Sequence, residues 1–583
     1  MLRSGLVLIA LAVVSFTWVG VRGVHAKVEL ESAIPLASKI QREVLAGDGE
    51  EAARLAADLA VHTATAASLT SDPVWRAFEL VPILGSNFTV VRELAFVVDD
   101  VSQTAITPLV ELASVTDLSD FELIEGSIDL QPLVDARPPI AAASAALAIS
   151  KKAVQGIDTT ETLDVVRSAA EKLETAVAEA MASVDVADRA VRLVPNMLGA
   201  AGSRNYVLLF QNPAELRATG GIAGAVALLH MDNGKIELVK HASSADFPTY
   251  NTPVLDLPTE TRGLFGDITG RYIQDVNLTP NFPLSAQLAR EMWSREFGLQ
   301  ADGVISIDPV ALSYLLQATG PITLPTGDVL TADNAVQKLL VEAYARYENP
   351  HDQDAFFAAA AASVFSAVSS GLSDPVALIT ALAQAGDERR VIVWNADEAD
   401  QAVLADTTLA GGLPISDADT TRFGVYLNDA TGAKMGTYLD VKIELGQAIC
   451  REDERPNYGV AVSVTNTAPA DAANSLPAYV TGGGAFGISP GNVKTLVSVY
   501  GAPGMQNLGM TRDGAAVAYH PARDSTYPVS TAAVELAPGE RTVLRYAWLG
   551  DKPFSGEIVA QATPGINRIE TRIMKTTCEF PLG

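Results

Sequence analysis

The pattern of apolar and polar positions changes three times along the chain. A run of 17 residues without a charged side chain, Gly5 to Val21, comes first. Apolar residues then recur at helical spacing as far as Pro195. Short apolar runs alternate with helical patterns from Arg204, and after about residue 420 only β-rich runs remain. This pattern predicts a multidomain protein with boundaries at 1–27, 28–200, 201–415 and 416–583.

The first apolar run predicts a transmembrane helix, or signal anchor, within residues 1–27. Its length lies at the short end of the roughly 17–25 residues that span a bilayer, and it exceeds the apolar core of about 7–15 residues in a cleaved signal peptide. Trp18 occupies the place of an interfacial aromatic residue. We expect a single-pass plasma-membrane protein with its bulk extracytoplasmic. The alternatives are a signal peptide cleaved after Ala26 and a buried core helix.

Residues 28–200 are predicted to be α-helical. An apolar stripe runs through residues 165–184, and Glu171, Lys172 and Glu174 lie on other faces. Ser71-Asp72-Pro73 supplies a helix cap followed by proline at the first helical position. These features are typical of a stalk or a packed bundle. A partner-binding coiled coil is the alternative, although the heptads are not sustained.

Residues 201–415 predict an α/β domain, because strands alternate with helices. Asn205 to Phe210, Gly303 to Ile307 and Arg390 to Trp394 are short apolar runs suited to buried strands. Asp232-Asn233-Gly234 lies between two further apolar runs, and this is the strongest short-range signal for a β-hairpin. Asp308-Pro309 opens a helix.

Residues 416–583 predict a β-sandwich of the immunoglobulin-like kind. Short β-rich runs are separated there by turns rich in Gly, Pro, Asn and Asp. The two cysteines of the chain, Cys450 and Cys578, both lie in this part. In an exported protein such a pair forms one disulfide that closes a long loop. Two buried thiols are the alternative.

The charge balance restricts the partners of the protein. The chain carries 41 Lys and Arg against 69 Asp and Glu, a net charge of −28. Such a field repels phosphates, so nucleic acid is not an expected partner, and an anionic ligand requires a local basic pocket. The six histidines are scattered, and the sequence contains neither a Walker loop nor a C-x-x-C pair. Zinc and nucleotide chemistry are therefore unsupported.

The stretch 211–221, after the first strand of the α/β domain, holds the strongest candidate site. Arg217 stands close to two consecutive glycines, which let backbone N–H groups converge on an anion while the guanidinium supplies charge. Glu215 is placed to orient Arg217. The alternative is an internal network of these two residues that braces a tight turn. The candidate ligand-binding residues in this stretch are Glu215, Arg217, Thr219, Gly220 and Gly221.

Acidic residues near these strands are candidates for a metal site. Asp246 and Asp302 carry the oxygen ligands that a divalent cation such as Mg²⁺ prefers. No other cofactor is expected. The alternative is that such residues cap helices, as Asp308 before Pro309 is placed to do.

The stretch 211–221, Q-N-P-A-E-L-R-A-T-G-G, resembles the signature of an uncharacterised bacterial envelope family, domain of unknown function 4012. The same resemblance extends over most of residues 1–445. It implies an anchored, helix-rich N-terminal part and no known activity. The other segments that carry it are 277–283, 301–309, 319–322 and 433–439.

A more distant resemblance is to the LytR-CpsA-Psr group, which transfers glycopolymers from lipid pyrophosphate carriers to the cell wall. Arg217 is similar in position to that group's loop arginine, and Tyr344-Ala345-Arg346 is similar to its Y-x-R segment. Two further arginine segments of the group are replaced here by 243–246 and 354–357. Their loss removes bidentate contacts to a pyrophosphate. Arg346 joins the candidate ligand-binding residues on this resemblance.

Two functions follow from these observations. The first is a membrane-anchored cell-envelope scaffold or binding module for an anionic glycopolymer or a lipid-linked ligand such as a polyprenyl phosphate. The alternative is a Mg²⁺-dependent phosphotransferase that attaches glycopolymers to the cell wall. The missing arginines favour the first function.

Overall fold

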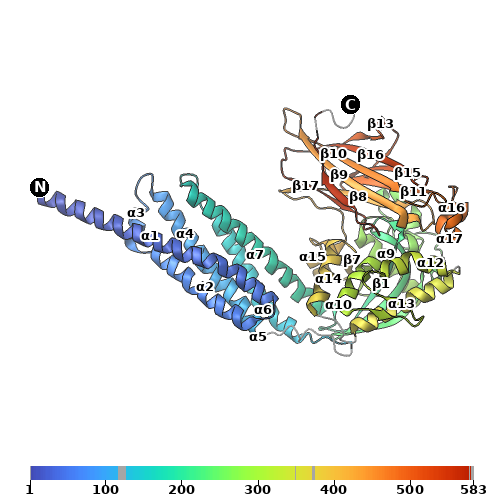
Figure 1. Ribbon diagram of the computed structural model, residues 1–583, viewed down its shortest axis with the longest axis horizontal. Helices are drawn as coiled ribbons and strands as arrows, with labels where there is room; N and C mark the ends of the chain where they lie inside the picture. Colours follow the sequence, from blue (N-terminus) through green and yellow to red (C-terminus); the bar gives the residue numbers. More distant parts are fainter. Residues whose placement is uncertain (1, 116–125, 348, 370–374, 577, 579–583) are drawn as a thin grey trace. The chain divides into compact units, whose positions relative to one another are not determined.

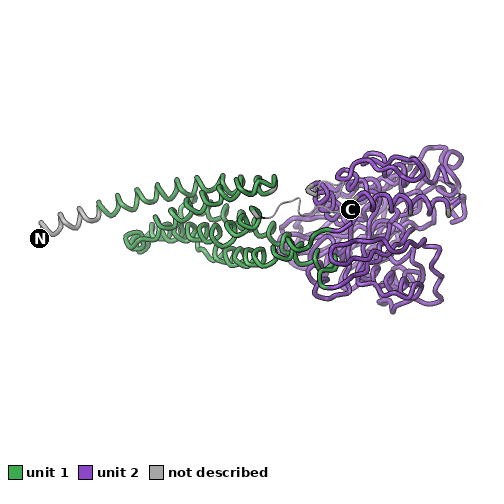
Figure 2. Tube along the Cα trace, turned by 90° about the horizontal axis from the view of Figure 1, so that it is seen from below, with its two compact units in different colours: residues 1–122, 128–201 green, residues 123–127, 202–583 purple. Residues whose placement is uncertain are grey.

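The computed structural model describes residues 2–115, 126–347, 349–369, 375–576 and 578 of the chain. It separates into two compact units (Figure 2). Unit 1 comprises Met1–Glu122 and Ile128–Ala201, and unit 2 comprises Leu123–Ser127 and Gly202–Gly583. The predicted division into four domains stays a prediction.

Unit 1 is built from long helices (Figure 1). Their apolar faces form shared cores, which explains why helices so rich in alanine are stable. Asp72 caps α3, where its side chain accepts hydrogen bonds from the N–H groups of Val74 and Trp75, as the sequence predicted. The helices are α1 (Leu2–Leu45), α2 (Gly49–Thr70), α3 (Pro73–Phe78), α4 (Gly85–Val101), α5 (Thr107–Val115), α6 (Gln131–Gln155) and α7 (Asp164–Met197).

The expectation of a transmembrane helix within residues 1–27 is wrong. Among the helices of the described residues, none is both long enough and apolar enough to cross a membrane. The membrane partnership and the single-pass plasma-membrane location with an extracytoplasmic bulk, which rested on that helix, are corrected with it.

The physical reason lies in what surrounds the apolar run. It is the first part of the 44-residue helix α1, which continues through charged positions. Val19 and Ala26 are buried inside unit 1, and Val19 packs with Trp75. Arg22 forms an ion pair of 2.9 Å with Asp72, from Nε to Oδ2. The run read in isolation revealed neither the continuation of the helix nor these partners.

The first part of unit 2 holds a five-stranded mixed sheet in the order β3-β2-β1-β4-β7. β1 pairs antiparallel with β2 and parallel with β4, and β7 pairs antiparallel with β4. The predicted hairpin turn joins β2 to β3, and Asn233 adopts the left-handed conformation there, with φ 48°. The strands are β1 (Arg204–Arg217), β2 (Gly220–Asp232), β3 (Lys235–Ser243), β4 (Gly303–Ile307) and β7 (Val391–Asn395).

Helices and a small two-stranded sheet accompany this central sheet. α9 contributes Phe282, Met292 and Trp293 to a core that it shares with β1, β2, β4 and β7. The helices are α8 (Thr259–Phe265), α9 (Phe282–Phe297), α10 (Pro309–Thr319), α11 (Ala335–Gln337), α12 (Ala343–Arg346), α13 (Pro350–Ser369), α14 (Pro375–Asp387) and α15 (Glu398–Leu404), and the small sheet pairs β5 (Ile322–Thr323) with β6 (Val329–Leu330).

The C-terminal part of unit 2 contains two larger sheets. Their orders are β13-β12-β16-β10-β9-β18 and β14-β15-β11-β8-β17, and inward side chains from both sheets form one apolar core. An immunoglobulin-like fold of this part stays a prediction. The elements are β8 (Thr420–Asp429), β9 (Leu439–Ile449), β10 (Pro456–Asn466), α16 (Ala472–Ser475), α17 (Ala478–Thr481), β11 (Val493–Tyr500), β12 (Gln506–Arg512), β13 (Ala515–Ala516), β14 (His520–Asp524), β15 (Tyr527–Leu536), β16 (Arg541–Leu549), β17 (Glu557–Ala562) and β18 (Glu570–Ile573).

The structure contains the predicted disulfide. Cys450 follows β9 directly, Cys578 follows β18, and their Cα atoms lie 5.5 Å apart. β18 is an edge strand that pairs parallel with β9. The disulfide therefore holds the C-terminal strand of the chain at the edge of the six-stranded sheet.

Replacing both cysteines, in C450S/C578S, is expected to lower the free energy of unfolding of unit 2 by about 2–4 kcal/mol, because the bond closes a long loop in the unfolded chain. The two cysteines are 128 residues apart in sequence. Urea unfolding of the full chain measures the change. A dithiol reductant should lower the stability of the wild type by the same amount and leave the variant unchanged. Equal stability of the variant and the wild type without reductant would contradict the prediction.

Candidate functional site

The stretch 211–221 is part of a hairpin and not an open loop. β1 continues to Arg217, and β2 begins at Gly220, with two irregularities in register between them. Gly221 lies so close to the facing strand that a Cβ atom there would come within 2.1 Å of the Asn212 carbonyl. Its N–H group donates to Gln211 Oε1 at 2.9 Å. The glycine therefore serves close packing of the hairpin, and its N–H group has a partner inside the protein.

Arg217 is buried, with 6% of its surface exposed, and lies between two carboxylates. Its Nη2 atom is 3.1 Å from Glu215 Oε1 and 3.1 Å from Asp275 Oδ1, and its Nε atom is 3.3 Å from the same Asp275 oxygen. Its Nη1 atom donates to the carbonyl of Leu216 at 3.0 Å. The guanidinium is thus engaged on all three nitrogens by groups of the protein.

Glu215 extends this pairing to the C-terminal part of unit 2. Its second oxygen, Oε2, forms an ion pair with Nζ of Lys434, which is itself buried and precedes β9. The Lys434 ammonium also lies 5.4 Å from the ring centroid of Tyr479. Glu215, Arg217, Asp275 and Lys434 therefore form one buried ion network that joins the central sheet to the two larger sheets.

Asp429, at the end of β8, adds a third carboxylate beside this network. Burial raises the pKa of Asp429 to about 6, and the nearby negative charge of Glu215 adds to the rise, while Arg217 opposes it. Burial also raises the pKa of Asp275, against the effect of Arg217. With three carboxylates and two cations, the group is neutral only when one carboxylate holds a proton.

Hydrogen bonds between uncharged groups also join the hairpin of β1 and β2 to the C-terminal part of unit 2. The N–H group of Ala218 donates to Asn428 Oδ1 at 3.0 Å, and Asn428 Nδ2 donates to the carbonyl of Leu278 at 3.1 Å. Thr563 Oγ1 donates to the carbonyl of Ala218 at 2.9 Å. The turn of the hairpin is therefore bonded to β8 and to the segment after β17.

Thr219 and Gln211 belong to a second polar cluster under the hairpin. Gln211 Nε2 donates to Thr219 Oγ1 at 3.0 Å and to Ser306 Oγ at 2.5 Å. Asn277 Nδ2 donates to the carbonyl of Gly221 at 2.6 Å. These buried side chains satisfy the backbone of a hairpin that β-bulges have disrupted.

The remaining sequence candidates lie elsewhere. Arg346 is half exposed and pairs with Asp328, at 2.7 Å from Nη1 to Oδ2. Tyr344 of the same segment reaches the hairpin, since Asn212 Nδ2 donates to its hydroxyl. Asp246 caps the short helix after Ser243, and Asp302 accepts from the N–H group of Asn205 at 2.7 Å.

Asp246 and Asp302 do not lie together in a metal site. In the described part of the chain, no group of three or more His, Cys, Asp or Glu side chains is arranged to hold a metal ion. Asp246 fits the capping alternative, whereas Asp302 bonds to residues at the start of β1, and the metal-binding role of both residues stays a prediction.

Three network members were missed in the sequence: Asp275, Lys434 and Asp429. Lys434 lies inside the family-like segment 433–439 and Asp275 just before 277–283, so both segments marked the region. Their charges gave no signal, because the residue that pairs with Glu215 is 219 positions away.

Fold and site together define a protein with an N-terminal helical region, a mixed central sheet and two further β-sheets, in which a charged hairpin is locked inside the structure. Residues 201–344 match the family described as "Protein of unknown function (DUF4012)", which confirms the resemblance read from the signature. No curated protein matches the chain. The likeness to the LytR-CpsA-Psr group stays a prediction, as do the ligand-binding roles of Glu215, Arg217 and Arg346.

The variant R217A is expected to lose about 3–5 kcal/mol of unfolding free energy, because it leaves Asp275 without its cation and leaves the buried Glu215 with Lys434 alone. R346A is the matched control: its arginine was an equal candidate from the sequence but sits in a surface pair, so a change of about 0–1 kcal/mol is expected. Urea unfolding of both variants measures the difference. Equal losses would mean that the network does not stabilise the fold.

D429N is expected to change the pH dependence of stability. The Asp429 carboxyl has an ordinary pKa near 3.8 in the unfolded chain and about 6 in the fold, so the folded protein binds more protons between these values. Stability is therefore lost as pH rises through that window. The variant should match the wild type near pH 4 and exceed it by about 1–3 kcal/mol near pH 7. Thermal unfolding across this range tests it; a difference that is constant with pH would contradict it.

Proposed function

We propose that the protein is a noncatalytic scaffold or binding module for an anionic envelope glycopolymer or a lipid-linked ligand. The observation that carries the proposal is the burial of the signature arginine: Arg217 is paired with Glu215 and Asp275 and keeps only 6% of its surface exposed. In this function the signature hairpin fixes the central sheet to the two larger sheets. The ligand then binds elsewhere on a rigid unit 2.

The same observation disfavours the phosphotransferase alternative. A pyrophosphate at Arg217 would have to displace Asp275 and Glu215, and separating a buried cation from its partners costs several kcal/mol. General acid or base chemistry needs a group that can reach a substrate. Glu215 instead uses both of its oxygens for internal ion pairs.

Charge and covalent structure are consistent with a binding role in the envelope. At a net charge of −28, the protein holds an anionic polymer only where cations are concentrated locally. The disulfide between Cys450 and Cys578 persists in oxidising compartments, where envelope glycopolymers are also found.

Binding without turnover is the expected result when the full chain is mixed with a polyanionic glycan and with a polyprenyl pyrophosphate in the presence of Mg²⁺. Calorimetry with oligogalacturonate should give saturable binding that weakens with salt, because exposed charges are screened. Chromatography of the lipid should show no cleavage.

A neutral dextran of similar length is the control polymer. Cleavage of the lipid by the wild-type chain would overturn the noncatalytic assignment. Absence of binding to both the acidic glycan and the lipid would overturn the binding function itself.

A further inference from the structure

A shallow trough runs along the outer face of the six-stranded sheet. β10 lies inside this sheet, between β16 and β9. Its inward residues fill the core, whereas its outward positions carry small residues, among them Ser463 and Thr465. Thr465 faces Asp440 of β9 and Arg541 of β16, and Ser463 faces Lys442. Short side chains on a central strand between longer ones on its neighbours produce a groove parallel to the strand.

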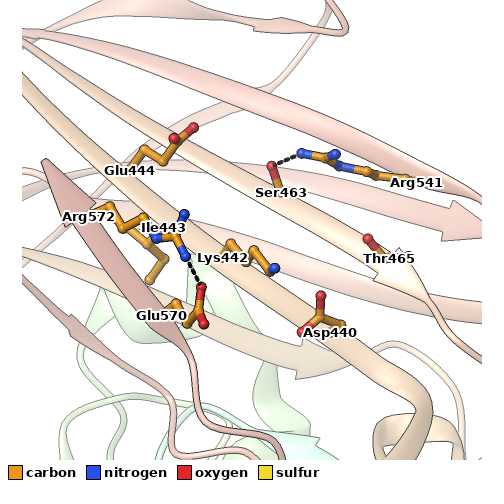
Figure 3. A pocket seen from close by; sticks show the side chains of 9 residues that line it. All are labelled: Asp440, Lys442, Ile443, Glu444, Ser463, Thr465, Arg541, Glu570 and Arg572. Atoms are coloured by element: carbon orange, nitrogen blue, oxygen red, sulfur yellow. Dashed lines mark hydrogen bonds and ion pairs between the residues drawn. The ribbon is translucent and has the colours of Figure 1, made fainter. Parts of the chain in front are cut away.

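This groove encloses a volume of about 230 Å³ and is called the β10 trough from here on (Figure 3). In the view of Figure 3, Lys442 lies between two bonded pairs, Arg541 with Ser463 and Arg572 with Glu570. Four strands contribute to the lining. The lining residues are Asp440, Lys442, Ile443, Glu444, Ser463, Thr465, Arg541, Glu570 and Arg572.

Free hydrogen-bonding capacity remains inside the trough. Among the described residues, neither Lys442 nor Arg541 has a carboxylate within 4.0 Å, and Asp440 and Glu444 have no cation within that distance. Arg541 Nη2 donates to Ser463 Oγ at 3.0 Å, which leaves its other nitrogens available. The trough thus offers hydrogen-bond donors on Lys442 and Arg541 and acceptors on Asp440 and Glu444, none of them in an ion pair with another described residue.

The lining identifies the ligand class by its chemistry. It is made of hydroxyl, carboxylate, ammonium and guanidinium groups, and its single apolar member, Ile443, is fully buried in the core. Such a surface gives nothing to an apolar ligand, but it matches a sugar chain, whose hydroxyls both donate and accept. The unpaired Lys442 and Arg541 add sites for carboxylate or phosphate groups.

We propose that the β10 trough binds an acidic glycan chain, with sugar hydroxyls bonded to Asp440 and Glu444 and an acidic group held by Lys442 and Arg541. This proposal rests on the binding function above and names the site of that function. The three cations of the trough offset its three carboxylates, so this surface is locally neutral on a protein of net charge −28. An acidic chain meets less repulsion there than on an acidic surface.

Cross-strand charge pairing gives a simpler role to the same residues. Glu570 lies opposite Lys442, and Arg572 opposite Glu444, in the register of β18 with β9. Opposite charges at facing positions of neighbouring strands stabilise a sheet. If that were their only role, variants would alter stability and leave glycan binding unchanged.

The experiment compares oligogalacturonate binding by the full-length wild type and by K442A/R541A, measured by calorimetry. The variant should bind at least about tenfold more weakly, since it loses two charge-assisted contacts to the acidic group. The control, R262A/R422A, removes one exposed and one partly buried arginine outside the trough and so makes the same change in net charge. It should bind as the wild type does.

T465Y provides a second variant that blocks the trough without removing a charge, and thermal unfolding shows that each variant is folded. It should also lose binding. Wild-type affinity in K442A/R541A and T465Y would overturn the site and leave the binding function standing. Equal weakening in the control would show a general charge effect and overturn the site. No binding of oligogalacturonate by the wild type would overturn the trough as an acidic-glycan site, and only together with no binding of the lipid would it overturn the binding function. Equal binding of neutral dextran would overturn the acidic class.

Discussion

The pairing of Glu215 with both Arg217 and Lys434 is the interaction on which the arrangement of unit 2 depends. A buried carboxylate between two cations is stable only while both are present, because each unpaired charge would pay its full desolvation cost. Arg217 belongs to β1 of the central sheet, and Lys434 belongs to the segment that leads into β9. Separating the two sheet systems would therefore break the ion pair between Glu215 and Lys434. Buried ion pairs of this kind contribute orientation as much as net stability.

A second network supports the same junction from another side. Arg390, at the start of β7, is buried and pairs with Asp308 at 2.8 Å and with Glu388 at 2.7 Å. Its Nη2 atom also donates to the carbonyl of Gly565, in the segment between β17 and β18. Burial raises the pKa of Asp308 even though Arg390 opposes the rise. Arg390 and the Glu215–Lys434 ion pair thus bind the central sheet to C-terminal segments far away in sequence.

Local chemistry explains which features the sequence predicted correctly. The turn at Asn233-Gly234 requires residues that tolerate positive φ, and the strand Gly303–Ile307 is a short apolar run followed by a capping aspartate. Each of these signals lies within a few residues of the element it specifies. The signature arginine was expected after the first strand, whereas the structure has Arg217 as the last residue of β1. Its carboxylate partner, Asp275, is 58 positions away, and nothing local identifies it.

The N-terminal helix was predicted wrongly for a related reason, because its partners are also distant in sequence. Its apolar run satisfied a length rule for membrane spans, but the rule considers one segment and ignores what packs against it. In the structure Arg22 bonds to carbonyl groups at the end of α2 and to Asp72, and Val19 lies in a core with Trp75. All of these partners are about fifty positions away. The error and the missed network members therefore have one cause, which is interaction between distant segments.

If the protein binds a ligand as proposed, the burial of the signature excludes Arg217 as the contact and directs attention to other surfaces of unit 2. The charges of the hairpin are paired within the protein, so the hairpin makes unit 2 more rigid. A rigid binding surface loses less entropy when it holds a ligand. The outer face of the six-stranded sheet has that property, since its inward face belongs to the core shared with the other sheet and its edge strand is fixed by the disulfide. Lys434 precedes β9, which is also the strand that supplies Asp440, Lys442 and Glu444 to the trough. One strand therefore connects the buried network, at its beginning, to the exposed charged surface along its length.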